Sequence, residues 1–219
     1  MQIKHRQSGF TLVEIAIVLV IIGLLLGGIL KGQEMITQAR IKNVINDFNG
    51  ITAAYFSYQD RYRAIPGDDA GAPARWTLGA PGTSATAGNG ILEGAWNDPS
   101  AAVEPETRLF WWNLRSAGFI AGPTAPAAQA SAQPTNAFGS LIGAATNAPV
   151  LNLTGLIICS SGIPDKVAIA VDTQMDDQNA GTGSLRAIIG GSTTSLAGVP
   201  GAVTYVETGS NQYLLCRGV

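Results

Sequence analysis

A long apolar segment near the N-terminus constrains this chain more than any other feature. From Ile15 to Leu30 every side chain is Ile, Val, Leu, Ala or Gly, and the run covers 21 residues when counted from Phe10, interrupted only by Thr11 and Glu14. As a helix rising about 1.5 Å per residue, it would extend about 30 Å, the thickness of a bilayer's hydrocarbon core. Basic residues flank it on both sides. We therefore expect a membrane-spanning helix.

Three interpretations compete for this segment. A secretory signal peptide has a shorter apolar core followed by a small-residue cleavage site, which this run does not match. A plain single-pass anchor explains the length but leaves Glu14 unexplained, because a carboxylate inside an apolar segment costs about 2.5–3.5 kcal/mol on insertion scales and normally has a partner. In the third interpretation, cleavage between Gly9 and Phe10 creates a free α-amino group at Phe10, and the amine of one subunit neutralises Glu14 of its neighbour.

The residues Gly9-Phe10-Thr11-Leu12-Val13-Glu14 stand behind a short basic leader and before the long apolar run. This arrangement resembles the class III signal of type IV prepilins and type II secretion pseudopilins. The resemblance implies that prepilin peptidase cleaves after Gly9, that Phe10 becomes the N-methylated mature terminus, and that Glu14 is the assembly carboxylate. It also implies like subunits in a filament, an inner-membrane assembly platform, and membrane lipid before assembly as partners.

These features predict four segments. Residues 1–9 form the prepilin leader, and residues 10–31 form the transmembrane or filament-core half of one helix. Residues 32–63 form its amphipathic half, in which apolar residues recur at steps of three and four. Pro66-Gly67 ends the helix, and residues 64–219 hold a globular head with an αβ-loop and a C-terminal disulfide region. We predict an α+β fold of the type IV pilin kind, with the long N-terminal helix packed against a head that contains a small antiparallel sheet.

Within the head, Glu106 to Phe119 predicts a second helix, whose two tryptophans we interpret as an aromatic core rather than a ligand platform. Residues 151–159 and 185–189 have strand character, and Pro164 can begin a short helix between them. Residues 199–215 predict a hairpin that turns at residues 207–211, because apolar and polar side chains alternate on both sides.

Composition excludes several classes of function. His5, the only histidine, lies in the leader, so the mature chain would have no Ser-His-Asp or Cys-His catalysis and no histidine zinc site. Charged residues make up 13% of the chain, with a net charge of −2. The head carries no basic patch, so nucleic acid is not an expected partner. We predict a structural protein rather than an enzyme.

Two cysteines, Cys159 and Cys216, remain in the head. Neither belongs to a Cys-x-x-Cys pair, which argues against a thioredoxin-like or zinc site. Outside the cytoplasm, an even pair favours a disulfide. Two buried free thiols are the alternative.

The best candidate for chemistry is an acidic cluster of Asp172, Asp176 and Asp177. Asp172 and Asp176 share a helix face at a spacing of four, and a hard cation such as calcium would offset negative charge at a helix C-terminus. Major pseudopilins carry calcium in a C-terminal loop, so the resemblance implies the same possibility here. The alternatives are a solvated acidic turn, aspartates that cap the loop, and pairing with Arg186.

We interpret Asp68-Asp69 near Arg75 as an ordinary helix-terminating turn.

The sequence thus predicts a type IV pilin-like structural subunit. It would be inserted in the inner membrane by a single helix with its head in the periplasm, because positive charge precedes the helix. It would then assemble into a filament at the cell surface or in the periplasm. A type II secretion pseudopilin is the alternative within this class. A membrane-anchored periplasmic binding module is the alternative from another class, and it would not need cleavage after Gly9.

Overall fold

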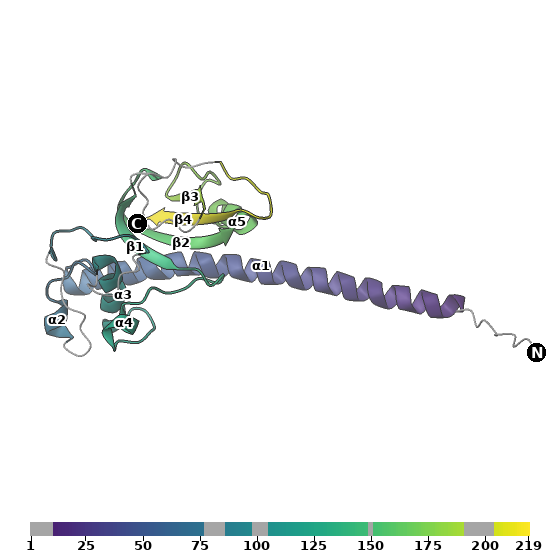
Figure 1. The fold of residues 1–219 in the computed structure, drawn as a ribbon, viewed down its shortest axis with the longest axis horizontal. Coiled ribbons are helices and arrows are strands. Elements are labelled where there is room, and N and C mark those ends of the chain that lie inside the picture. Colours follow the sequence, from purple (N-terminus) through teal and green to yellow (C-terminus); the bar gives the residue numbers. More distant parts are fainter. Residues whose placement is uncertain (1–10, 77–85, 98–104, 149–150, 191–203) are drawn as a thin grey trace, which may run out of the picture. The chain divides into compact units, whose positions relative to one another are not determined.

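The structure is a computed structural model that describes residues 11–76, 86–97, 105–148, 151–190 and 204–219 (Figure 1). It forms two compact units, Met1–Ala39 and Arg40–Val219, and each is described by itself. The helix α1 contributes its first part to one unit and its second part to the other.

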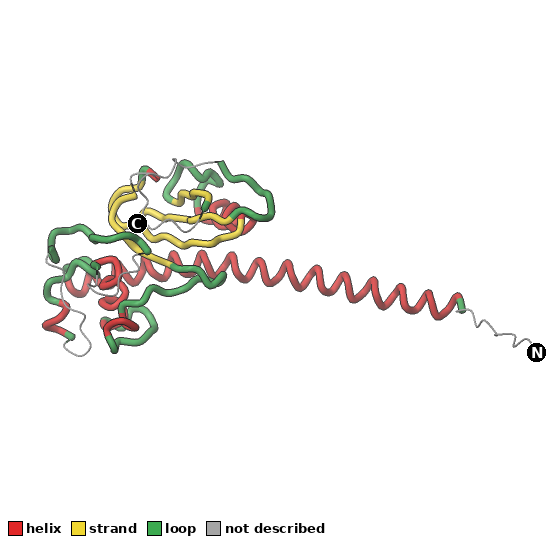
Figure 2. The backbone as a smooth tube through the Cα atoms, viewed as in Figure 1, coloured by secondary structure: helices red, strands yellow, loops and turns green. Residues whose placement is uncertain are grey.

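Helix α1 runs without a break over the 51 residues Leu12–Tyr62 (Figure 2). It ends where Arg63 adopts the left-handed conformation, with φ of 54°, and its amide donates to the Gln59 carbonyl at 2.8 Å. A left-handed residue is a common way to stop a helix. The single long helix that the apolar and periodic stretches predict is therefore confirmed. It ends shortly before Pro66 rather than at it.

The second part of α1 packs one face into the main core of the head. Its buried side chains recur at steps of three and four, as an amphipathic helix requires, and they are Ile41, Val44, Phe48, Ile51, Ala54, Tyr55 and Tyr58. The same core includes Trp111 and Leu114 of helix α3 (Glu106–Ser116) and Ile158 of the sheet. Trp111 and Trp112 are both buried, which confirms that the tryptophan pair is core. The helix ends at Ser116, three residues before the predicted Phe119, and a left-handed glycine, Gly118, follows it.

The sheet has four strands in the order β1-β2-β4-β3, and every neighbouring pair is antiparallel. The strands are β1 (Ile142–Ala148), β2 (Leu153–Pro164), β3 (Leu185–Ile189) and β4 (Gln212–Gly218). The alternation of side chains divides them between two cores. Ile158 and Leu215 belong to the core that contains α1, whereas Ile157 and Leu214 belong to a second core with Trp96. The small antiparallel sheet expected for the head is thus confirmed.

Cys159 and Cys216 lie directly opposite each other on β2 and β4 and form the predicted disulfide, with their Cα atoms 4.1 Å apart. Such a close separation is typical of a cross-strand pair whose residues do not exchange backbone hydrogen bonds. Both half-cystines are fully buried in the second core, on the sheet face that does not carry Ile158. The disulfide therefore joins the two central strands.

Helix α5 (Asp165–Met175) follows Pro164 directly, as the proline predicts, and it buries Val167, Ala168 and Val171. The predicted hairpin over residues 199–215 is wrong in its described part, because residues 204–211 form no strand. Instead, β4 pairs with β2 and β3, which lie earlier in the chain. Alternation at both ends of a turn predicts strand character but not the partner strand, and here more distant strands supply the pairing.

Strand β1 was not predicted, because its sequence Ile142–Ala148 has small residues and no apolar alternation. Two short helices complete the described elements, α2 (Ala72–Arg75) and α4 (Ala127–Ala130). They lie in the loops before and after α3, where the sequence predicts little regular structure.

Candidate functional site

The start of α1 is built by a reciprocal pair of hydrogen bonds between Thr11 and Glu14. The Glu14 amide donates to Oγ1 of Thr11 at 3.3 Å, and the Thr11 amide donates to Oε2 of Glu14 at 2.8 Å. The Thr11 hydroxyl also donates to Oε2 at 2.7 Å. Thr11 precedes the first helical residue and Glu14 is the third, so this is a capping box. Glu14 therefore has a partner in its own chain, which the sequence analysis missed although Thr-x-x-Glu is its signature.

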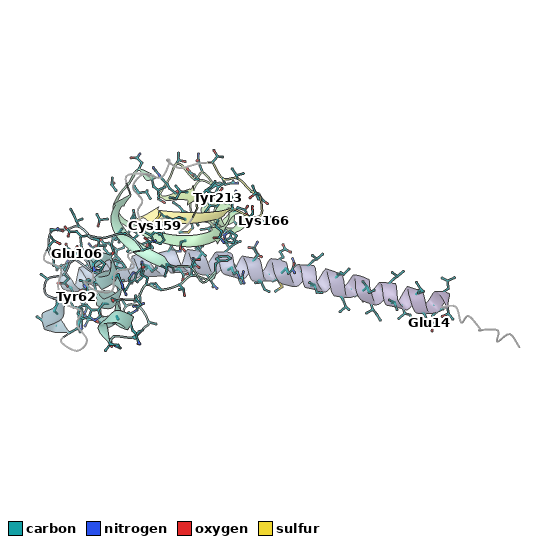
Figure 3. All side chains as sticks on the ribbon, in the orientation of Figure 1. Glu14, Tyr62, Glu106, Cys159, Lys166 and Tyr213 are labelled. Carbon is teal, nitrogen blue, oxygen red and sulfur yellow. A yellow bond between two sulfur atoms is a disulfide. The ribbon has the colours of Figure 1, made fainter. Side chains whose placement is uncertain are left out.

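The first part of α1, which follows this cap, exposes its apolar side chains on every face. Its large apolar side chains between Leu12 and Leu30 have exposed fractions from 46% at Ile22 to 88% at Leu12. Among the described residues α1 is the one helix that is long and apolar enough to cross a membrane. Figure 3 marks Glu14 at the start of this helix. So much apolar surface requires cover from lipid or from other chains.

At four positions of this stretch the packing of the chain itself does not require glycine. They are Gly23, Gly27, Gly28 and Gly32. A Cβ atom at any of them would meet nothing within 4 Å. Each glycine in a helix interior costs about 1 kcal/mol relative to alanine. Small residues of this kind let neighbouring helices approach closely in a membrane.

Residues 4–30 match the model of the prokaryotic N-terminal methylation motif. The chain carries a class III prepilin signal. This signal is typical of type IV pilins and pseudopilins, as the sequence analysis expected. The chain has no significant match among curated proteins or solved structures. Gly9 and Phe10 fall inside the prepilin signal but outside the described residues, so cleavage and methylation there stay predictions.

Beyond the prepilin signal, the structure brings the three aspartates of the acidic cluster together. One carboxylate oxygen from each of Asp172, Asp176 and Asp177 lies within 4.8 Å of the others. Asp176 follows the last residue of α5, and Asp172 is fully buried on that helix. The type and spacing of these oxygens fit a hard cation. A calcium site at this position stays a prediction.

Protein donors already occupy most of these oxygens. The Gln178 amide and the Tyr205 hydroxyl donate to the two oxygens of Asp172, at 3.2 and 2.7 Å. The Leu185 amide donates to Asp176 at 2.8 Å. These bonds support the alternative in which the aspartates cap the loop. Arg186, the other proposed partner, donates to the carbonyls of Gly183 and Leu151.

Burial is the largest influence on the titration of Asp172. It raises the pKa of Asp172, and the nearby charges of Asp177 and Asp176 act in the same direction, against the hydrogen bonds from Tyr205 and Gln178. Burial and the bond to Asp172 likewise raise the pKa of Tyr205. The hydrogen bond from the Thr182 hydroxyl lowers the pKa of Asp177. A cation would oppose the upward shift at Asp172, because it stabilises the ionised carboxylate.

Asp165, at the start of α5, binds the segment of residues 204–211, where the sequence predicted part of a hairpin. Its carboxylate accepts from the amides of Lys166, Thr208 and Gly209 at 2.8, 2.8 and 2.6 Å. Burial alone would raise the pKa of Asp165, but these hydrogen bonds outweigh it and lower the pKa. With Asp172 bonded to Tyr205, two buried carboxylates of one helix fix residues 204–211.

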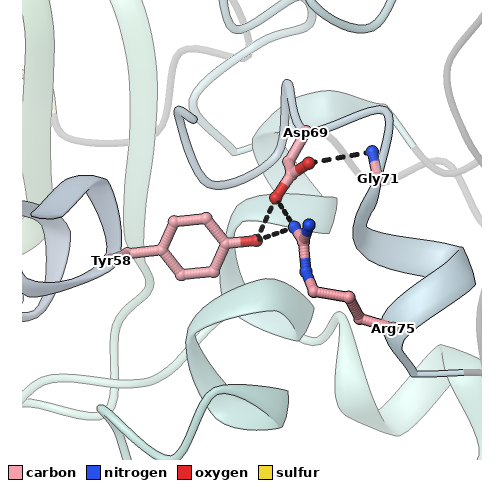
Figure 4. Close-up of polar contacts among 4 residues, drawn as sticks. All are labelled: Tyr58, Asp69, Gly71 and Arg75. Atoms are coloured by element: carbon pink, nitrogen blue, oxygen red, sulfur yellow. Dashed lines mark hydrogen bonds and ion pairs between the residues drawn. The ribbon is translucent and has the colours of Figure 1, made fainter. Parts of the chain in front are cut away.

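The pair Asp68-Asp69 does not terminate a helix as predicted, because α1 already ends at Tyr62; the two carboxylates instead anchor the loop that follows. Tyr58 on α1 donates to Oδ2 of Asp69 at 2.6 Å, Arg75 forms an ion pair with the same oxygen, and the Gly71 amide donates to Oδ1 at 2.9 Å (Figure 4). The Arg75 guanidinium also stacks over the ring of Tyr62, 4.7 Å from its centroid. Burial and the bond to Asp69 raise the pKa of Tyr58. This cluster ties the first loop to the end of α1.

Asp68 and Glu106 anchor the rest of that loop. Asp68 is buried and accepts from the amides of Gly88, Asn89 and Gly90. Glu106, fully buried at the start of α3, accepts from the Glu93 amide at 3.0 Å. The sequence offered no periodic signal for these contacts, because each joins residues more than ten positions apart.

Proposed function

We propose that this chain is a pilin-like structural subunit, cleaved after Gly9 by prepilin peptidase, methylated at Phe10 and polymerised through α1. The observation that carries the proposal is the prepilin signal over residues 4–30, which continues directly into an apolar helix with no cover of its own. Before assembly, lipid of the inner membrane covers this helix. After extraction by an assembly platform, the same surface is covered by the helices of like subunits.

Glu14 has two roles in this proposal, taken in sequence. In the isolated subunit its carboxylate closes the capping box with Thr11. In the filament, the methylated amine of a neighbour's Phe10 approaches the same carboxylate. A carboxylate has two oxygens and can accept bonds from both partners. The low dielectric between packed helices strengthens such an ion pair, which fixes the axial offset between subunits.

The first experiment determines the mature N-terminus by mass spectrometry of the protein isolated from membranes. We expect a chain that begins with N-methylated Phe10. A chain that begins at Met1 would reject processing and favour the anchored binding module.

A second experiment separates the two roles of Glu14. Glu14→Ala removes the carboxylate from the cap together with its charge, and we expect the yield of sheared fibres to fall at least about tenfold, because the neighbour's amine then has no partner. Thr11→Val removes the two hydrogen bonds of the Thr11 hydroxyl and so weakens the cap, but it keeps the charge of Glu14, so we expect fibres to persist at reduced yield. Glu34→Ala is the matched control, because Glu34 is exposed on the same helix and pairs only with Lys31 among the described residues.

Subunit levels in the membrane fraction should be equal in all three variants. Normal fibres from Glu14→Ala would remove this carboxylate from the assembly mechanism. If Thr11→Val fails as completely as Glu14→Ala, the cap rather than the neighbour's amine would be the essential contact. Retention of fibres in the periplasm, with a secretion defect on deletion of the subunit, would identify a pseudopilin.

A further inference from the structure

One carboxylate on the second part of α1, that of Asp47, is half-buried and has no partner in its own chain. Among the residues that the structure describes, none donates a hydrogen bond to Asp47 or forms an ion pair with it. Burial raises the pKa of this carboxyl. Arg40 lies about two turns earlier on the same face, but its guanidinium stacks over the ring of Phe138, 5.2 Å from the centroid. A partly desolvated carboxylate without a partner is unfavourable in the isolated subunit.

The matching cation on the same helix is Lys42. It is exposed, and it is the one described lysine without an ion pair, since Lys31 and Lys166 each pair with a glutamate. Lys42 and Asp47 do not meet within one chain, because neighbours on a helix surface are three or four residues apart. At about 100° per residue, the step of five residues puts them on faces about 140° apart.

Two complementary charges on different faces of one helix suit a head-to-tail interface between copies. Such an interface joins two different patches, and it generates an open filament when its rotation does not close. In parallel helices, Lys42 of one copy comes level with Asp47 of the next at an offset of about five residues, or about 7.5 Å. The pair proposed between the Phe10 amine and Glu14 needs an offset of about four residues, or about 6 Å, in the same direction. Nearly the same offset therefore serves both pairs.

A second pair of side chains follows the same register on the same two faces. Phe56 is 53% exposed and lies nearly four full turns after Lys42, so it shares the face of Lys42. Arg61 is exposed and lies equally far after Asp47. Within its own chain, Arg61 stacks over the ring of Tyr62, 5.4 Å from the centroid. The offset of five residues brings Phe56 of one copy level with Arg61 of the next, where a guanidinium and an aromatic ring attract each other.

We propose that the second part of α1 docks on a second copy of this chain, with Lys42 of one copy paired to Asp47 of the next. In the same interface, Phe56 contacts Arg61 of the neighbouring copy. The inference rests on the proposed polymerisation through α1, and it adds specific contacts outside the apolar first part. Attraction across the interface offsets the desolvation of Asp47 that the isolated subunit leaves uncompensated.

Carbodiimide crosslinking of wild-type fibres tests the contact on the native residues. The reagent activates a carboxylate, and an amine within reach displaces the activating group to form an amide. We expect mass spectrometry of the crosslinked dimer to find an amide between Lys42 and Asp47. Because the two side chains do not meet within one chain, this amide joins two copies. Lys42→Arg should keep the charge and the fibres but lose the crosslink, since a guanidinium does not couple.

Asp47→Asn separates assembly from folding. Above its raised pKa, ionised Asp47 destabilises the isolated subunit, and this penalty is absent below the ordinary pKa of the carboxyl. At pH 7 the variant should therefore unfold in urea, in detergent micelles, at the same or a higher concentration than the wild type. Its yield of sheared fibres should nevertheless fall about threefold, within the range of surface ion pairs. Phe56→Ala should also lower the yield without destabilising the head, because Phe56 is exposed.

Asp60→Asn is the matched control, because Asp60 is an exposed aspartate of the same helix that pairs only with Arg63 among the described residues. It should change neither the unfolding of the head nor the yield of fibres. An equal loss of fibres in Asp60→Asn and Asp47→Asn would overturn the proposal, because it would show an effect of net charge rather than of this contact.

Charge reversal gives the sharpest comparison. Lys42→Asp and Asp47→Lys should each lower the fibre yield about tenfold, because like charges then face each other across the interface. Combining them restores the attraction, so the double variant should yield more fibres than either single variant. Tryptophan fluorescence checks the fold of each head, and Asp47→Asn carries the test if Asp47→Lys does not fold.

The proposal is overturned if wild-type fibres give no amide between Lys42 and Asp47, or if the double variant yields no more fibres than the single ones. Fibres without this amide reject the interface alone and leave the proposed polymerisation standing. If the wild type forms no fibres, the proposed polymerisation fails, and this interface fails with it.

Discussion

The two parts of α1 have the same backbone conformation but opposite surroundings. Ile41 in the second part is 2% exposed, whereas Ile22 in the first part is 46% exposed. In the second part, polar residues separate the apolar ones and leave one buried face; in the first, apolar residues occupy every face. One continuous helix can therefore have two different environments, a protein core around its second part and exposed apolar side chains along its first part. The second part packs into its own head, while the first exposes apolar surface that, in the proposed function, lipid or other subunits cover.

The largest expected effect tests whether the head is stable independently of the first part of α1. Replacing both cysteines with alanine should lower the free energy of unfolding of the head by about 4 kcal/mol, because the disulfide closes a loop across a sequence separation of 57. Tryptophan fluorescence in urea measures this, since all four tryptophans lie in the head. Far-UV circular dichroism should show that the helical signal of residues 12–39 survives. If this helical signal is lost in the same transition as the fold of the head, the two parts of α1 unfold as one cooperative unit.

A matched pair of isoleucines tests the comparison directly. Ile41→Ala should destabilise the head by about 2–5 kcal/mol, the usual result of truncating a core side chain. Ile22→Ala should change the same fluorescence transition by less than about 0.5 kcal/mol, as expected away from the core. Both variants are measured by tryptophan fluorescence in urea, in the same detergent micelles. Equal shifts would mean that the exposed part contributes to the head after all.

Acid should act on the head rather than on the first part of α1, where Glu14, Lys31 and Glu34 are the only charged residues from 11 to 39. The lowered pKa of Asp165 means that its contribution is present above the carboxyl's ordinary pKa and is lost as pH falls through the lowered value. Asp165→Asn should therefore destabilise the head by about 1.5–3 kcal/mol at pH 7. The difference from wild type should shrink as the pH falls toward 2.

Asp60→Asn is the control for this experiment, because Asp60 is exposed and pairs only with Arg63 at 3.7 Å among the described residues. It should leave the pH dependence of unfolding unchanged. A penalty for Asp165→Asn that is the same at pH 7 and at low pH would show that shape, not charge, is what Asp165 contributes.

Calcium should have the smallest effect, and again on the head alone. If Asp172, Asp176 and Asp177 bind it with a Kd near 10⁻³–10⁻⁴ M, about 1 mM calcium stabilises the head by roughly 0.4–1.4 kcal/mol. Chelation should lower the Tm by the corresponding few degrees, and Asp176→Ala should abolish the response. Identical melting curves with and without chelator would leave the aspartates as loop caps, the alternative that their hydrogen bonds support.

The sequence predicted best where one local signal was sufficient. The apolar run and its periodic continuation predicted α1, because helix periodicity depends on residues three and four apart. The segment Gly9–Glu14 predicted the prepilin signal. The two cysteines likewise predicted their bond, since an even pair outside the cytoplasm favours a disulfide over free thiols. The small residues of β1 gave no such signal, and neither did the loop anchors Asp68 and Glu106, whose partners are distant in the chain.

By itself, the sequence determined the long helix with its apolar first part and its amphipathic second part, because these patterns do not depend on the rest of the fold. It favoured a disulfide over two free thiols, and the structure shows the bond. Tertiary structure decided what β4 pairs with and what the buried carboxylates do. Apolar and polar residues alternate before and after a plausible turn, with Tyr205 on one side and Tyr213 on the other. Strand β4 nevertheless lies between β2 and β3, where both its faces are buried. Asp165 and Asp172 then hold residues 204–211 through hydrogen bonds rather than through a strand. Strand pairing and the satisfaction of buried polar groups depend on residues distant in the chain, and only the folded molecule brings them together.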